Sequence, residues 1–530
     1  MILGVVELFS PLPHDFGVSI QDASPFLLSQ DDSRSREELE KLAADNLQNI
    51  IYQADPDLIR NWMPIICSAL NAGKLGETLI LGFSQFALGD HAGLKATLRL
   101  LEIGHPESNY QEVIDYEAKI LRMRNEFNFG NFDEVENLYN SIPKTVSIQI
   151  TRNPAEHFSR HRASLAAAFY VQDKVKFFKH FEKIEEFLGQ EFGSILHMNM
   201  NTYQAMNSFL HGKYIEANEY GLAALKLADE LSVNGAYSPF EAAYVLADTY
   251  LEFGDNKNSE EITQKYLARA IEFNQYPWIT AFYAKLAILR LQEGNISSAL
   301  SAIRTGREKI DSSIFSSYLS LPLDIHEIII RMQFDDMERI NEIIPRLPNI
   351  QISEGFKMAI QMNKNPESVS NLIHLFPENN DQEKFRKELT MAVVNIENRP
   401  SAINHLERAI ELAIPNGYFR SFLNMPTQIK NYMLDIAAKS PTVYTEKIAS
   451  AIRNQVSRLS TSYATDHIPL TKRELDVLRR LGTNMPITKI ASSMHISNNT
   501  IKTHLKNVYR KLNVDSRDEA VARAKELSLL

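Results

Sequence analysis

One pattern of about 40 residues recurs along most of this chain: a helical stretch ends in a polar turn, usually at glycine, and a second helical stretch follows. The turns are centred on Gly89, Gly130, Gln172, Gly212, Gly254 and Gly294. Successive turns are therefore 41, 42, 40, 42 and 40 residues apart, with Gln172 once taking the place of glycine. A regular period of this length predicts stacked helical hairpins, because one pair of helices cannot bury its apolar face without its neighbours.

The residue types at and after these turns support this interpretation. Glycine suits a turn after a helix because the left-handed backbone needed there costs it nothing sterically. Small residues such as Ala217 and Ala299 follow in several second helices and would allow close helix contact. The period continues more loosely through residues 334–338 and 398–402. The units resemble tetratricopeptide repeats, although those usually have about 34 residues, so we describe them as TPR-like.

These patterns divide the chain into four parts. Strand signals are nearly absent and apolar residues recur at helical spacing, so we expect an all-α fold. Residues 36–452 are predicted to form a TPR-like helical-repeat solenoid, and residues 453–469, which are poorer in apolar side chains, a linker. Residues 470–530 form a separate domain, and residues 1–35 match no repeat and stay unassigned.

Charge is distributed unevenly between these parts. The whole chain has a net charge of -10, which alone would argue against nucleic acid. Residues 470–530, however, contain 12 Lys and Arg against 6 Asp and Glu, a net charge of +6. The other 469 residues contain 44 against 60, a net charge of -16. A small basic domain on a large acidic body is typical of a protein that touches DNA with one end.

The basic domain divides into four predicted helices with recognisable start signals. Thr471 and Glu474 form a capping box, Pro486 suits the first turn of the second helix, and Ser497 caps the third. A second capping box at residues 516–519 begins the fourth helix. The third helix has an apolar stripe, suited to packing on a small core: Ile501, Leu505, Val508 and Leu512. Its polar stripe could donate to base edges and phosphates in a major groove: Asn499, Lys502, Thr503, Lys506 and Arg510.

Residues 470–530 resemble the LuxR/GerE-type helix-turn-helix of bacterial regulators over their full length. Many positions fall on the family pattern: Leu470, Thr471, Arg473, Glu474, Ile490, Ala491, Ser497, Thr500, Lys502, His504, Lys511, Leu512 and Arg517. There are two departures: Asn484 replaces the family's turn glycine, and residues 487–489 read Ile-Thr-Lys instead of Asn-Lys-Glu.

This resemblance implies double-stranded DNA as a partner and assigns roles to individual residues. The implied base contacts are Lys502, Thr503 and Lys506. The implied phosphate contacts are Lys489, Ser497, Asn499, Thr500 and Arg510. The family commonly pairs two modules through the fourth helix, so residues 520–529 are a candidate dimer surface and a dimer is expected on DNA.

A second resemblance covers the repeats. Residues 405–423 and 55–79 resemble parts of the large LuxR regulators of the maltose-activator (LAL) type. Those proteins usually carry an N-terminal ATPase of the STAND class, which we expect this chain to lack. Of the candidate enzymatic or metal sites, Gly73-Lys74 lacks the rest of a phosphate-binding loop. His157 and His161 have a metal-compatible spacing without the motif of a metalloprotease, and Cys67 lies in an apolar stretch that favours an inert thiol.

We therefore expect neither an enzyme nor a metal or cofactor site. No apolar run approaches the roughly 20 residues that cross a bilayer, and a lone cysteine fits a reducing cytoplasm, where we expect the protein. The main hypothesis is a transcription activator whose repeats sense a protein, peptide or small molecule. The alternative is a repeat-scaffold adaptor that recruits partners to promoters without sensing. RNA polymerase is an expected partner of such a regulator.

Overall fold

A computed structural model describes residues 73–102, 111–142, 154–185, 194–310, 316–332, 336–350, 353, 378, 380–466, 472–483, 485–494, 496–512 and 514–526. All regular secondary structure in these ranges is helical, which confirms the all-α fold class. Within them, no helix is both long and apolar enough to span a lipid bilayer. The segment 1–35, Cys67 and most of the stretch 55–79 lie outside the described residues.

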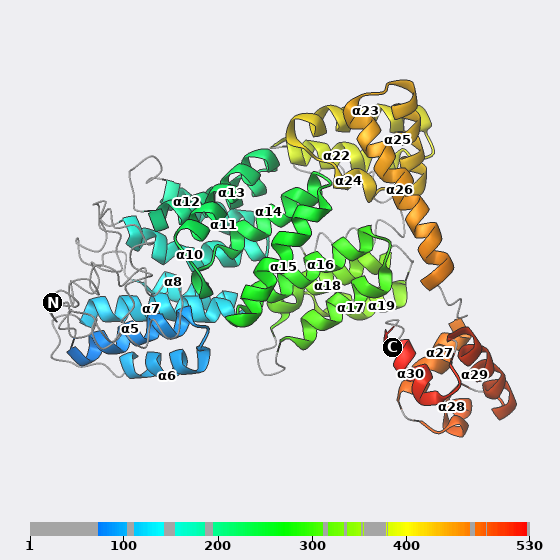
Figure 1. Ribbon diagram of the computed structural model, residues 1–530, viewed down its shortest axis with the longest axis horizontal. Coiled ribbons are helices and arrows are strands. Elements are labelled where there is room, and N and C mark those ends of the chain that lie inside the picture. Colours follow the sequence, from blue (N-terminus) through cyan, green and yellow to red (C-terminus); the bar gives the residue numbers. More distant parts are fainter. Residues whose placement is uncertain are drawn as a thin grey trace, which may run out of the picture.

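The described helices form a repeat solenoid, a C-terminal lobe and a C-terminal domain (Figure 1). The described part of the solenoid contains six hairpins: α5 (Gly73–Ala87) with α6 (His91–Glu102), α7 (Gln111–Asn128) with α8 (Phe132–Ser141), α10 (Pro154–Tyr170) with α11 (Lys174–Glu185), α12 (Ser194–Leu210) with α13 (Tyr214–Glu230), α14 (Phe240–Glu252) with α15 (Asn256–Glu272), and α16 (Tyr276–Gln292) with α17 (Ile296–Glu308). The next described helices are α18 (Ser317–Met332) and α19 (Met337–Ile343). The C-terminal lobe contains α22 (Asp381–Val394), α23 (Arg399–Asn416), α24 (Arg420–Leu423), α25 (Thr427–Lys439) and α26 (Val443–Asp466).

The six predicted turns join the two helices of the six hairpins. Each central residue, including Gln172, has a left-handed backbone with φ between 57° and 81°. The residue after it donates its N–H to the carbonyl five residues back, at 2.8–2.9 Å in every case. This is the Schellman arrangement, which satisfies carbonyls left free at a helix end. The first helices of neighbouring hairpins, such as α12, α14 and α16, also pack on one another, as the TPR-like repeat predicts.

Three of these turns also make contacts that the repeat does not predict, with segments far later in the chain. The Tyr418 hydroxyl donates to the Gly212 carbonyl at 2.8 Å, and the Ser316 hydroxyl donates to the Gly130 carbonyl at 3.0 Å. A Cβ built on Gly254 would lie 2.7 Å from the ring of Phe419. The glycine turns of early hairpins are therefore packed directly against later parts of the structure.

A continuous apolar core follows from this winding. It includes buried residues from α7 through α26. Trp278 shows how distant repeats meet: its ring is stacked on Phe240 at 6.3 Å and edge-on to Tyr170 at 6.2 Å. The Tyr170 hydroxyl also hydrogen-bonds to Thr280 at 2.6 Å. Aromatic side chains of α10, α14 and α16 therefore fill the space between these helices.

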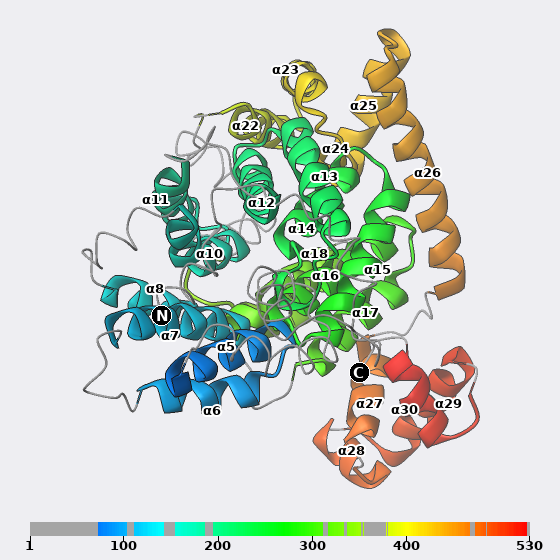
Figure 2. The same cartoon turned by 60° about the vertical axis from the view of Figure 1, so that its left-hand side comes forward.

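The C-terminal lobe lies over the α12–α13 and α14–α15 hairpins (Figure 2). Arg420 at the start of α24 forms ion pairs with Asp248 at 3.3 Å and Glu252 at 3.1 Å, both on α14. Lys285 of α16 also pairs with Asp248. Burial would raise the pKa of Asp248, but the two cations lower it to about 2. This buried charge cluster joins the lobe to the solenoid.

The described connection between the lobe and the C-terminal domain is helical over most of the predicted linker. Helix α26 continues through residues 453–466. Residues 467–471 lie outside the described residues. The described part of the connection is therefore a helix that begins in the lobe and extends toward the C-terminal domain (Figure 1).

The turn contacts predict a specific loss of stability. Gly212→Ala should lower the free energy of unfolding by about 2 kcal/mol or more, because a left-handed backbone costs an L-residue roughly 1–2 kcal/mol and the added Cβ would overlap Gln382 and Tyr418. Gln172→Gly is the matched control, since Gln172 already has φ 57° at the equivalent turn. Urea unfolding of the full chain should place the control within about 1 kcal/mol of wild type. An unchanged midpoint for Gly212→Ala would contradict the contact.

Candidate nucleic-acid interface

The C-terminal domain has its own apolar core. It contains α27 (Lys472–Gly482), α28 (Ile487–Ser493), α29 (Asn498–Leu512) and α30 (Arg517–Glu526). All four residues of the predicted stripe on α29 are buried: Ile501, Leu505, Val508 and Leu512. They pack with Val477, Leu478 and Leu481 of α27 and with Ile490 and Ala491 of α28. Helix α29 therefore presents one fixed face to the interior and the opposite face outward.

Local hydrogen bonds set where these helices begin. The Thr500 N–H donates to the Ser497 hydroxyl at 3.1 Å, which confirms Ser497 as the cap of α29. The Glu519 N–H donates to the Ser516 hydroxyl at 3.2 Å, and the Glu519 carboxylate accepts from the Asp515 N–H at 3.1 Å. The bond from Glu519 to the Ser516 hydroxyl is the one expected of a capping box at the start of α30, while the Glu519 carboxylate reaches back one residue further, to Asp515.

Three residues of the family pattern join helices inside the domain. The buried Glu474 carboxylate of α27 pairs with the Lys511 ammonium of α29 at 2.6 Å. The Arg517 guanidinium of α30 donates to the Leu481 carbonyl at the end of α27, at 2.8 Å. Glu474 is predicted from sequence as the capping partner of Thr471, which lies outside the described residues. In the structure, the ion pair of Glu474 with Lys511 holds α29 against α27.

The predicted contact residues lie on the outer surface of the domain. On α29 the side chains of the polar stripe are all exposed: Asn499, Lys502, Thr503, Lys506 and Arg510. The residues at the start of α29 and the lysine on α28 are exposed as well: Ser497, Thr500 and Lys489. The Thr503 hydroxyl donates to the Asn499 carbonyl at 3.0 Å, so its oxygen remains available as an acceptor.

A surface groove of about 650 Å³ runs beside α29. Three of the predicted contact residues line it: Lys502, Lys506 and Arg510. The groove also contains Ile487, Leu505, Tyr509, Val514 and Asp515. In the sequence Ile487 is marked only as a departure from the family pattern. Tyr509 is not among the predicted contacts, although it follows Lys502 and Lys506 at helical spacing. Three cations along one groove attract a polyanion.

The candidate dimer surface needs a correction. Ala520 and Ala524 of α30 are fully buried in the domain core and cannot contact a second copy. Their spacing of four residues places both on the inner face of the helix. Among the residues of α30 in the predicted range whose side chains the structure describes, Ala522 and Arg523 are exposed. Residues 527–530 lie outside the described residues.

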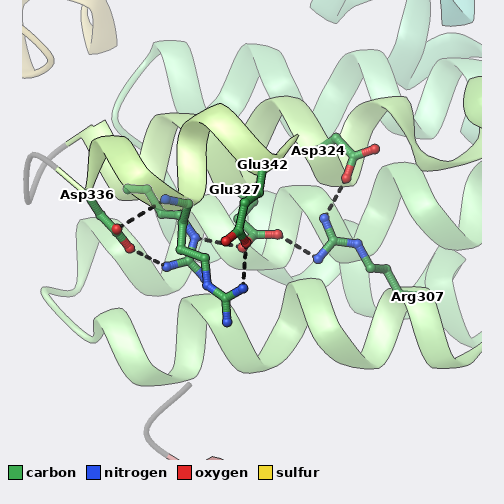
Figure 3. Close-up of polar contacts among 7 residues, drawn as sticks. Arg307, Asp324, Glu327, Asp336 and Glu342 are labelled. Atoms are coloured by element: carbon green, nitrogen blue, oxygen red, sulfur yellow. Dashed lines mark hydrogen bonds and ion pairs between the residues drawn. The ribbon is translucent and has the colours of Figure 1, made fainter. Parts of the chain in front are cut away.

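The domain also contacts the solenoid. Arg479 of α27 pairs with Glu338 of α19 at 3.1 Å. An ion-pair network holds α19 in turn: Arg307 bridges Asp324 and Glu327 of α18, and Arg331 bridges Glu327 and Asp336, which caps α19 (Figure 3). The contact to α27 leaves the polar side chains of α29 exposed.

The histidine pair with metal-compatible spacing, His157 and His161, is described for the side chain of His161 alone. His161 is buried, and its Nδ1 lies 3.0 Å from Nδ1 of His180 in a hydrogen bond. The side chain of His157 lies outside the described residues. Within the described part of the chain, no group of three or more His, Cys, Asp or Glu side chains is arranged to hold a metal ion.

Comparisons with known proteins concern the C-terminal domain. The family described as "Bacterial regulatory proteins, luxR family" matches residues 468–524. The nitrate/nitrite response regulator protein NarP of Escherichia coli is 40% identical over 83 residues, 15% of this chain and 36% of that protein. The HTH-type transcriptional regulator MalT of Vibrio cholerae is 42% identical over 59 residues, 11% of this chain and 6% of that protein. The chain therefore spans well under two thirds of the length of these relatives.

Solved structures align with this chain at low similarity. A Rap protein complexed with competence and sporulation factor has a TM-score of 0.39 at 9% identity, over 74% of this chain and 98% of that one. The APC/C hetero-tetramer Cut9-Hcn1 has a TM-score of 0.33 at 12% identity, over 79% of this chain and 73% of that one. At the C-terminal end of the chain, the sequence match agrees with the four helices and their caps. Residues 468–524 are a helix-turn-helix domain of the LuxR family.

Proposed function

We propose that this chain is a sequence-specific DNA-binding transcription regulator, acting as an activator. The observation that carries the proposal is the exposed polar stripe of α29, in which lysine and arginine alternate with amide and hydroxyl groups on the face opposite the buried stripe. In a helix-turn-helix motif the second of the two helices, here α29, enters the major groove. Such groups can donate there to guanine O6 and N7. The names of the relatives NarP and MalT support the same role.

Charge distribution supports a division of labour between the two ends. The net charge of +6 over residues 470–530 provides phosphate attraction. The net charge of -16 over the rest would keep the solenoid itself away from DNA. We infer that two modules bind DNA as a dimer and that the exposed side chains Ala522 and Arg523 contribute to their contact.

In this proposal the repeats sense a protein, a peptide or a small molecule. Two cavities between the described repeat helices measure about 40 and 30 Å³. Each has room for about one or two water molecules, whereas sites for organic ligands are typically several hundred Å³. These volumes favour a partner on the solenoid surface over a small molecule in either cavity. The same volumes suit the adaptor alternative. The two differ in DNA affinity: binding of a partner shifts the affinity of a sensor for DNA and leaves that of an adaptor unchanged.

The base-reading role of α29 is tested by Lys506→Ala. The variant should lose roughly 1–3 kcal/mol of binding free energy at the cognate site and discriminate less between bases, because a lysine donating to guanine carries sequence information. Fluorescence anisotropy with the cognate duplex and single-base variants measures both effects. Lys506 is exposed, so the circular dichroism spectrum should not change.

Lys489→Ala tests the phosphate role and serves as the matched control. It should weaken binding to cognate and random duplexes by the same factor, and the slope of log affinity against log salt should fall by about 1. Titrations at several salt concentrations measure the slope. Equal, sequence-independent losses from Lys506→Ala and Lys489→Ala would show that Lys506 does not read bases.

A further inference from the structure

Ile487, the first residue of α28, is an exposed apolar side chain in a cationic groove. About 36% of its surface is exposed, and it lines the same groove as Lys502 and Lys506. The core residue Leu505 also reaches the groove but is only 5% exposed. Ile487 therefore provides an exposed apolar surface in the groove that is not buried in the domain core.

The position of Ile487 is well defined by the chain around it. Pro486 precedes α28 with extended backbone angles, and its carbonyl accepts the N–H groups of Lys489 at 2.9 Å and Ile490 at 3.0 Å. Ile490 and Ala491 anchor the helix in the domain core. A β-branched side chain also has few rotamers, so ordering it on binding costs little entropy. The apolar surface is thus presented in nearly one orientation.

The chemistry of the major groove then limits what this surface can recognise. The base edges there present hydrogen-bond donors and acceptors, and thymine alone among the four adds a methyl group, at C5. An isoleucine cannot satisfy a donor or acceptor, and placing it against one would leave that group unpaired. A thymine methyl offers apolar burial without this penalty.

We propose that Ile487 contacts the C5-methyl group of a thymine in the bound site, and so specifies a base that the lysines of α29 do not. This inference rests on the proposed function, because it places the groove of α29 against base edges. It assigns a specificity role to α28, while the family resemblance implies base contacts only on α29.

The test removes one methyl group at a time from the DNA. The full-length protein first selects its preferred duplex from a random library. Each thymine of that duplex is then replaced singly by deoxyuridine, which pairs identically and lacks only the methyl group. Dissociation constants are measured for wild type, Ile487→Ala, Ile487→Val and Met485→Ala. Met485 is a matched control because it is 38% exposed two residues earlier and is not among the residues lining the groove.

Wild type should bind about fourfold more weakly when one particular thymine becomes uracil, the factor expected for one buried methyl group. Ile487→Ala should bind the thymine duplex about fourfold more weakly or worse and show no further loss with uracil at that position. Ile487→Val, which keeps a branched apolar side chain, should retain the sensitivity, as should Met485→Ala. Equal urea midpoints for all variants establish that folding is unaffected.

Two results would overturn the inference while leaving the proposed function intact. One is a selected duplex at which no uracil replacement weakens wild-type binding. The other is a uracil penalty that persists unchanged in Ile487→Ala at every position. A wild-type protein that enriches no duplex sequence at all would overturn the proposed function itself, and this inference with it.

Discussion

The structure depends on the close packing of hairpin turns, whose central residues have a left-handed backbone, against segments far later in the chain. A stacked array of hairpins needs only contacts between neighbours, and such an array would leave its turns in solvent. Here the carbonyls of Gly130 and Gly212 accept hydrogen bonds from Ser316 and Tyr418. A side chain on these turns would collide with the later helices. Glycine at these turns therefore permits both the reversal of the chain and the long-range contact.

Buried charge makes the second long-range connection, between the solenoid and the C-terminal lobe. Arg420 is held between two carboxylates of α14, while Lys285 shares one of them. Desolvating these groups has a large cost, so the cluster is weak evidence for added stability. Leaving any one member unpaired would be more costly still, which favours one position of the lobe over slightly shifted ones. Helix α24, which begins at Arg420, packs on α26, so the cluster also connects α26 to the solenoid.

Local patterns in the sequence predicted local structure well, and long-range structure poorly. The spacing of the glycines located all six hairpin turns, including Gln172, because a helix reversal leaves a mark in adjacent residues. The contact between Gly212 and Tyr418 has no such mark, since the partners are 206 residues apart. In the C-terminal domain the buried stripe of α29 followed from its helical period. Glu474 has the type and position of a capping residue, and only the fold brings Lys511 to it.

The C-terminal domain separates the residues that hold it together from those that face outward. Glu474, Lys511 and Arg517 belong to the family pattern and connect α27 with α29 and α30 inside the domain. The three cations that line the groove, Lys502, Lys506 and Arg510, take no part in these connections and have exposed side chains. The side chains of residues 487–489, where this chain departs from the family pattern, are exposed, so a substitution there leaves these internal contacts in place. Under the proposed function, what this surface recognises can therefore change without altering the fold.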